Sequence, residues 1–269
     1  MAEYDSQPGR VSPPDPELTQ AQHDADEEDL QAGLSGLAAI VVDVLTVDES
    51  LTQIAEFAAH AIPGADGAGV TVAHPSGKPL HIQSWAVTDE FVRKIDTLQY
   101  RLHEEGPCIT SLRTARPCVS GSISDDPRWP GFGGAVVRLG VNSALSLPLI
   151  LREQVIGVIN AYAYTLDAFA EHAVAMGTKF AGPAAVAVHN AGLVMAAQHR
   201  AEQLQQALGS RSVIDQAIGI IRARSGVSAE EAFDRLTKIS QDENTKLHVV
   251  AERLVEISVR RARARHDPS

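Results

Sequence analysis

The C-terminal stretch, residues 208–265, constrains the fold of this chain most strongly. Apolar residues recur there at spacings of three and four within residues 210–224, 228–239 and 247–257, which predicts three amphipathic helices. Gly226 follows the first run, as glycine commonly does past a helix end. Ser228 and Glu231 then have the spacing of a capping box, which opens the second helix. Three helices of this size predict one small bundle.

The order of residues in this bundle resembles the ANTAR family of RNA-binding transcription antiterminators. The resemblance spans residues 207–257 without a gap. It rests on Ser210, Arg211, Ile214, Ala217, Gly219, Ala232, Phe233, Leu236, Ser240, Asn244, Leu247, Val250 and Ala251. Gly219 stands in mid-helix, where glycine costs about 1 kcal/mol relative to alanine and where close approach of a partner would explain it. The family often has a lysine just before this glycine, and the chain has Ile218, so one cationic contact is absent.

The resemblance implies that polar side chains of the bundle contact RNA. The expected contact residues are Arg211, Gln216, Gly219, Arg222, Arg224, Ser240, Asn244 and Lys246. Residues 209–269 hold eleven Lys and Arg against nine Asp and Glu, in a chain whose formal net charge is −11. Binding a phosphate backbone requires cations along one surface. For each arginine alone, a solvated helix face is the alternative interpretation.

Length and composition predict a second, larger domain upstream of the bundle. No apolar run is judged long enough for a membrane helix, and the N-terminus is acidic and rich in proline, unlike a signal peptide. We therefore expect a cytoplasmic protein without a membrane partner. Its two cysteines, Cys108 and Cys118, are too few for a disulfide framework and lack zinc-site spacing, so no metal site is expected.

The pattern predicts five consecutive segments. The first thirty residues hold nine acidic side chains and one basic one, so residues 1–33 are expected to form a disordered acidic tail. Residues 34–192 form the larger domain, 193–208 a connecting helix or coiled coil, 209–258 the bundle, and 259–269 a basic tail.

Helices and alternating strands follow one another in residues 37–191, which predicts an α+β domain with an antiparallel sheet. Residues 67–73 and 79–87 form one expected hairpin, turning at 74–77, and residues 144–151 and 155–163 form a second. Several phrases there resemble the GAF sensor domain as it occurs ahead of ANTAR segments in actinobacterial antiterminators. These phrases are residues 105–108, 125–130, 139–143, 146–149 and 155–160.

GAF domains as a class hold a small ligand between the sheet and its covering loops. The resemblance therefore implies a pocket bounded by Trp85, Glu105, Cys108, Trp129 and Ser146. Each has a structural alternative, since tryptophans and a small thiol are common core residues. No motif requires a cofactor, and the sequence does not identify the ligand.

No catalytic constellation is found in the sequence. There is no phosphate-binding loop with a lysine, no nucleophile elbow and no zinc-protease helix motif. Cys108 begins a short helix, but no histidine follows it, and a reactive thiol needs a lowered pKa. We expect a non-enzyme.

A long helix is expected to join the two domains. Its narrow apolar stripe, with Asn190 inside it, is typical of a two-helix seam and predicts a parallel homodimer. The expected function is a signal-responsive regulator that binds paired RNA stem-loops in nascent transcripts and prevents termination. Two alternatives stay open: a bundle that contacts a protein partner, and a small redox enzyme built on the GAF pocket.

Overall fold

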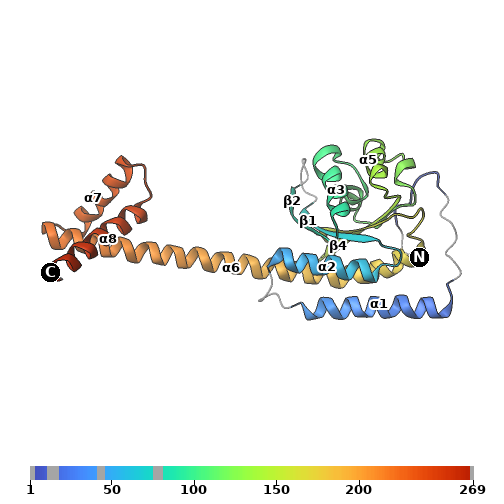
Figure 1. Cartoon of the computed structure of the whole chain (residues 1–269), viewed down its shortest axis with the longest axis horizontal. Helices are drawn as coiled ribbons and strands as arrows, with labels where there is room; N and C mark the ends of the chain where they lie inside the picture. Colours follow the sequence, from blue (N-terminus) through green and yellow to red (C-terminus); the bar gives the residue numbers. More distant parts are fainter. Residues whose placement is uncertain (1–3, 11–17, 41–45, 75–80, 267–269) are drawn as a thin grey trace. The chain divides into compact units, whose positions relative to one another are not determined.

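The computed structural model describes residues 4–10, 18–40, 46–74 and 81–266 (Figure 1). The chain divides into two compact units, Met1–Met195 and Ala196–Ser269. One helix, α6 (Glu171–Ser225), contributes to both units.

A five-stranded antiparallel sheet forms the centre of the first unit, in the order β2-β1-β5-β4-β3. Its strands are β1 (Gly67–His74), β2 (His81–Val87), β3 (Cys118–Ser120), β4 (Ser143–Leu151) and β5 (Gln154–Ala163). Both predicted hairpins and the α+β class are confirmed. Most of the expected turn of the first hairpin, residues 75–77, lies outside the described residues.

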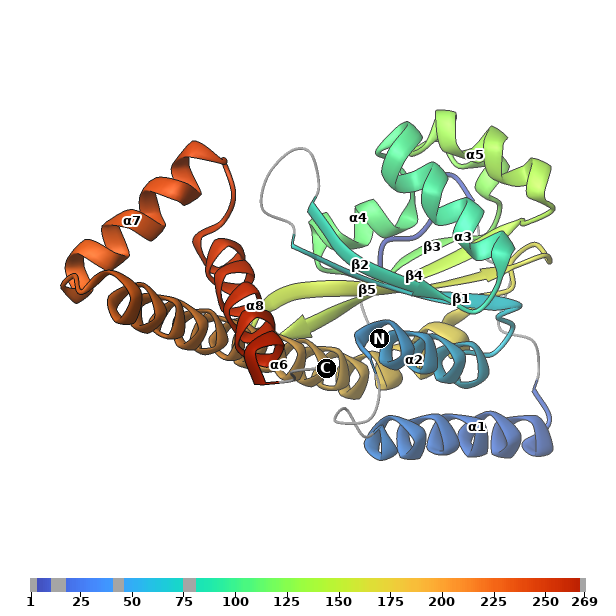
Figure 2. The ribbon, with the colours of Figure 1, turned by 60° about the vertical axis from the view of Figure 1, so that its left-hand side comes forward.

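Each face of the sheet packs against its own set of helices (Figure 2). One face is apolar, with Val70, Leu147 and Ile159 fully buried, and it packs against α2 (Val47–Ala61) and the first part of α6. The helix α1 (Gln20–Ala39) packs against α2 on the side away from the sheet. The other face is covered by short helices. These are α3 (Glu90–Thr97), the π-helix η1 (Leu98–His103), α4 (Pro107–Thr114) and α5 (Pro130–Val136), with the 3-10 turns η2 (Ile123–Asp125) and η3 (Val137–Leu139).

The first element, α1, corrects the expectation that residues 1–33 are disordered. Thr19 and Gln22 form its capping box, and Leu30, Gly33 and Leu37 lie buried at helical spacing. Two of the acidic side chains that suggested disorder, Asp26 and Glu27, contact α6. Asp26 Oδ2 lies 2.8 Å from His172 Nε2 and Glu27 Oε2 lies 3.5 Å from Lys179 Nζ, so polar contacts to α6 accompany the buried leucines.

Residues 4–10 also belong to the folded unit. The Asp5 backbone bridges to Cys118 beside β3, and Arg10 pairs with Asp167, its Nε donating to Oδ1 at 2.8 Å. Residues 1–3 and 11–17 of the expected tail, like residues 41–45, lie outside the described residues.

One stretch of α6, Glu171–Gln198, is long and apolar enough in composition to cross a membrane, contrary to the expectation that no run would qualify. About a third of this window, 33%, is buried. Phe180, Ala184 and Val188 lie in the hydrophobic core of the first unit.

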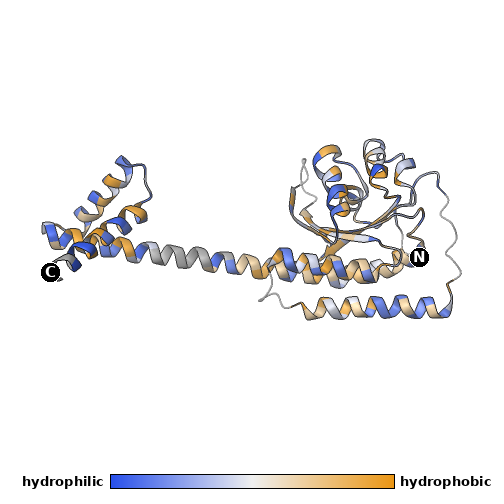
Figure 3. Cartoon of the chain, in the orientation of Figure 1, coloured by the Kyte–Doolittle hydropathy of each residue, from blue (hydrophilic) through white to orange (hydrophobic). Residues whose placement is uncertain are grey.

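The second unit is a three-helix bundle made by the end of α6, α7 (Ala229–Asp242) and α8 (Leu247–His266). Apolar and polar positions alternate around these helices (Figure 3). Ala217, Leu236, Val250 and Ala251 form the buried core, as the spacing predicts. The capping box is confirmed, with Ser228 Oγ accepting from Glu231 N at 3.1 Å. The first helix differs from expectation, because it continues α6 without a break at Ser210.

Candidate functional site

A set of polar side chains occupies the sheet face under the short helices. In the strand register Thr71 lies opposite Trp85, Gly69 opposite Asn160, and Asn160 opposite Ser146. Directly opposed residues of antiparallel strands point to the same face. A polar floor in a domain interior requires partners for every group.

Residues of α3, η1 and α4 supply most of those partners. Tyr100, from the π-helix, shares hydrogen bonds with Thr71 at 2.7 Å and with Cys108 Sγ at 3.1 Å, and accepts one from Asn160 at 3.2 Å. Gln99 donates to the Tyr162 hydroxyl at 2.7 Å and accepts from the Cys108 amide at 3.0 Å. Together these groups form the buried polar cluster, which consists of Thr71, Asp96, Gln99, Tyr100, Cys108, Ser146, Asn160 and Tyr162.

Two atoms at this cluster are buried with no hydrogen-bond partner among the described residues: Asp96 Oδ2 and Trp85 Nε1. Asp96 is fully buried, and its other oxygen accepts from the Tyr162 hydroxyl at 2.9 Å. Burial raises the pKa of Asp96 to about 7. A Cβ on Gly69 would stand 3.2 Å from Asp96 Oδ2, so this oxygen lies directly over a glycine of the sheet. An unpartnered buried atom costs about 1–3 kcal/mol, which a bound polar molecule would recover.

The five expected pocket residues divide into two groups. Trp85, Cys108 and Ser146 lie at the buried polar cluster. Glu105 instead accepts hydrogen bonds from the amides of Gly131 at 2.7 Å and Phe132 at 2.8 Å, so it caps α5. Trp129 is 3% exposed and donates to Thr110 at 3.0 Å, while the Arg128 guanidinium stacks over its ring.

Sequence reasoning missed Asp96, Gln99, Tyr100 and Tyr162. The first three follow helical spacing beside the buried Val92 and Ile95. A row of polar residues beside a row of apolar ones is also typical of a solvent-exposed helix face. The sequence pattern therefore does not distinguish a buried polar cluster from an exposed one.

Neither cysteine has the environment of a reactive thiol. Burial raises the pKa of Cys108 to about 12, and burial likewise raises the pKa of Cys118 to about 12. A thiol is nucleophilic only as the thiolate, which these environments disfavour at neutral pH. Within the described ranges, no three His, Cys, Asp or Glu side chains are grouped so as to hold a metal ion.

In the second unit, four of the expected RNA-contact residues share the solvent face at the end of α6. Arg211, Gln216, Gly219 and Arg222 are all exposed and lie on the side away from the buried Ala217. Nothing lies within 4 Å of the position a Cβ on Gly219 would take, so no packing inside the unit requires a glycine there.

The other four expected residues lie elsewhere on the bundle. Arg224 donates to Ser258 Oγ at 2.9 Å, tying α6 to α8. Ser240 donates to the Thr245 carbonyl at 2.5 Å, and Asn244 adopts a left-handed conformation (φ 49°) in the same α7–α8 turn. Lys246 precedes α8 and is exposed. Ser240 and Asn244 therefore shape the turn, which gives them structural roles.

The family model for GAF domains matches residues 44–189, more than half of the chain, and the model for ANTAR domains matches residues 202–255. The chain belongs to the GAF family and carries an ANTAR domain. GAF is a signal-sensing domain and ANTAR an RNA-binding antitermination domain, so the pair makes a regulator.

Solved structures share the fold of the GAF domain at low identity. The GAF domain of a phosphoenolpyruvate-protein phosphotransferase from Coxiella burnetii is 15% identical, covering 66% of this chain and 99% of that chain with a TM-score of 0.50. A free methionine-R-sulfoxide reductase from Neisseria meningitidis, solved with its substrate, is 15% identical, covering 68% and 99% with a TM-score of 0.47. No curated protein sequence matches the chain.

Proposed function

We propose that this protein is a cytoplasmic, non-enzymatic regulator whose ANTAR domain binds paired stem-loops in nascent transcripts and prevents a terminator from forming. Its GAF domain senses a small molecule, and two copies act together. The exposed face of Arg211, Gly219 and Arg222 is the observation that carries the proposal. It offers cations beside an unobstructed backbone, which suits contact with a phosphate chain.

RNA hairpins test this face directly. Arg211→Ala and Arg222→Ala in the full chain should each weaken hairpin binding and reduce the slope of log affinity against log salt by about one unit, because each removes one phosphate contact. Arg113→Ala, an exposed arginine of the GAF domain, is the matched control and should leave the slope unchanged. If all three variants keep the wild-type slope of log affinity against log salt, Arg211 and Arg222 are solvated helix residues and do not contact phosphate.

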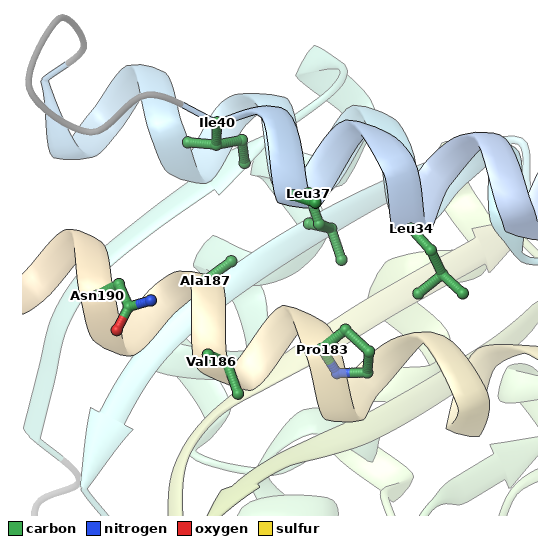
Figure 4. A pocket seen from close by; sticks show the side chains of 8 residues that line it. Leu34, Leu37, Ile40, Pro183, Val186, Ala187 and Asn190 are labelled. Atoms are coloured by element: carbon green, nitrogen blue, oxygen red, sulfur yellow. The ribbon is translucent and has the colours of Figure 1, made fainter.

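A groove in the first unit supports the two-copy arrangement (Figure 4). It has a volume of about 400 Å³ and lies between α1 and α6, lined by Leu34, Leu37, Ala38, Ile40, Pro183, Val186, Ala187 and Asn190. Val186 is 47% exposed, and Leu193, on the same side of α6, is 56% exposed. The exposed side chains of this row, Val186, Asn190 and Leu193, follow the spacing of a helix seam. A second copy would cover the row and place two ANTAR domains within reach of paired hairpins.

The buried polar cluster supports the sensory role. Asp96 Oδ2 and Trp85 Nε1 are buried without hydrogen-bond partners among the described residues. Gln99 and Tyr100, in the same cluster, come from a π-helix, a form often found at functional sites. This cluster, which includes Cys108 and Ser146 and lies beside Trp85, is therefore the proposed site of the small-molecule ligand.

A further inference from the structure

The ANTAR domain has an apolar groove on its surface, apart from the solvent face of α6. The groove has a volume of about 290 Å³ and lies where α7 and α8 meet the end of α6. Its lining residues are Ile221, Arg235, Leu236, Ile239, Glu243, Val250, Arg253, Leu254 and Ile257. Ile239 is 41% exposed and Ile257 42% exposed, so two branched aliphatic side chains are partly open to solvent here.

The helical spacing places cations along the rim of this apolar floor. Arg235 lies one turn before Ile239 on α7, and Arg253 lies one turn before Ile257 on α8. Arg260 and Arg261 follow Ile257 by three and four residues and extend the cationic row along α8. Within the part of the chain that the structure describes, no ion pair involves Arg235.

The acidic neighbours do not prevent an anion from binding. Glu243 pairs with Arg253, and Glu256 lies 4.0 Å from Arg260. Both pairs are exposed, and exposed pairs contribute about 0–1 kcal/mol, so a phosphate can replace either carboxylate at small cost. Arginine also binds phosphate oxygens through two parallel hydrogen bonds, a geometry that lysine lacks.

We propose that this groove takes one unstacked base of an RNA loop, with the flanking phosphates held by Arg235 and Arg253. This inference rests on the proposed RNA-binding function and adds a site that reads the loop. The size of the groove favours this occupant, because its volume lies at the lower end of small-molecule sites, which suits a single flat ring. Bases in RNA loops are unstacked and bind apolar and guanidinium surfaces through their faces. Arg235 and Arg253 at the rim complement the phosphates on either side of that base.

The test is a double-mutant cycle on the full chain: hairpin affinity is measured with the protein residue changed, with the loop base removed, and with both changes together. RNA hairpins with one abasic site at each loop position in turn are titrated against the wild type and against Ile239→Ala, Ile257→Ala and Arg235→Lys. Val259→Ala is the matched control, since Val259 is 43% exposed but lies on the opposite side of α8 from Ile257.

One abasic position should weaken wild-type binding about tenfold or more, as base-stacking contacts typically do. Ile239→Ala and Ile257→Ala should weaken binding to the intact hairpin about as much and should lose their effect on that abasic hairpin. Arg235→Lys keeps the charge, so it should keep the salt slope, but it should weaken hairpin binding severalfold. This variant tests the groove even if an isoleucine variant does not fold. Val259→Ala should behave as the wild type.

Three results would overturn the inference, and they are distinguishable. If the abasic and protein effects are additive at every position, the groove does not hold a base, although hairpin binding stands. If the isoleucine variants bind hairpins normally, the groove has another occupant, such as a protein. If the wild type binds no hairpin, the proposed function fails together with this inference.

Discussion

At the scale of single residues, Gly219 separates stability from binding. It stands in mid-helix, exposed, with nothing within 4 Å of the position a Cβ would take. Gly219→Ala should therefore stabilise the folded chain by up to about 1 kcal/mol, measured by urea unfolding. If an RNA backbone approaches there, the same change should weaken hairpin binding severalfold. Gly134→Ala, also exposed in a helix (α5) and with open space around it, should stabilise without affecting RNA. Tighter or unchanged hairpin binding by Gly219→Ala would contradict the contact.

A second prediction at this scale is that Asp96 makes the folding stability depend on pH. Its folded pKa of about 7 lies above the ordinary value of 3.8, so between these values the folded state holds a proton that the unfolded state has lost. Stability from this group is full below pH 3.8 and decreases as pH rises to about 7. The wild type should lose about 2 kcal/mol from this group between pH 5.5 and 8.

Asp96→Asn provides the comparison, because it removes the titration while retaining an oxygen for Tyr162. Urea unfolding at pH 5.5 and pH 8 should show the variant gaining stability relative to the wild type at the higher pH. Parallel pH dependences of the two proteins would mean that Asp96 titrates normally.

The pocket shows how far single residues can be predicted. Trp85, Cys108 and Ser146 were expected at the pocket from the resemblance to GAF domains, and all three lie at the buried polar cluster. Glu105 and Trp129 were assigned to the pocket from the same resemblance, yet their side chains cap and pack around α5. Sequence spacing locates a backbone position but does not determine which of two nearby partners a long side chain contacts.

At the scale of elements, α1 is the main departure from expectation. Composition predicted disorder, and the structure has a helix in which Leu30, Gly33 and Leu37 are buried. Leu30 is 1% exposed, so Leu30→Ala should destabilise the GAF domain by about 2–5 kcal/mol in urea unfolding. Glu28→Ala, exposed two residues earlier, should change stability by less than about 0.5 kcal/mol. If both substitutions change the free energy of unfolding by less than about 0.5 kcal/mol, α1 does not pack against the domain and the expectation of a disordered tail is correct.

Elements with strong local signals were predicted well. The Ser228–Glu231 capping box and the two hairpins depend on neighbours in sequence, and all three are present. The bundle's first helix begins before residue 210, where the expected run started, because it continues α6. Whether a helix continues through residues 209 and 210 depends on the helical segments on both sides, because helix formation is cooperative.

At the scale of the whole molecule, the shared helix α6 makes dimerisation and RNA binding testable together. Leu193, 56% exposed on the groove side of α6, lies in the row expected to face a second copy. Leu193→Glu would place a charge in that apolar seam and should convert the proposed dimer to a monomer in analytical ultracentrifugation. Met195→Glu, 49% exposed on the other side of the helix, is the charge-matched control and should remain dimeric.

The same pair of variants decides whether the dimer serves RNA recognition. A dimer binds the second hairpin of a linked pair at a high effective concentration, so the wild type and Met195→Glu should prefer paired over single hairpins by at least tenfold. Leu193→Glu should bind single hairpins normally, because Leu193 lies outside the ANTAR domain, and should lose the preference. A monomeric Leu193→Glu that still prefers paired hairpins would show that one chain engages both stem-loops, and the two-copy arrangement would then be wrong.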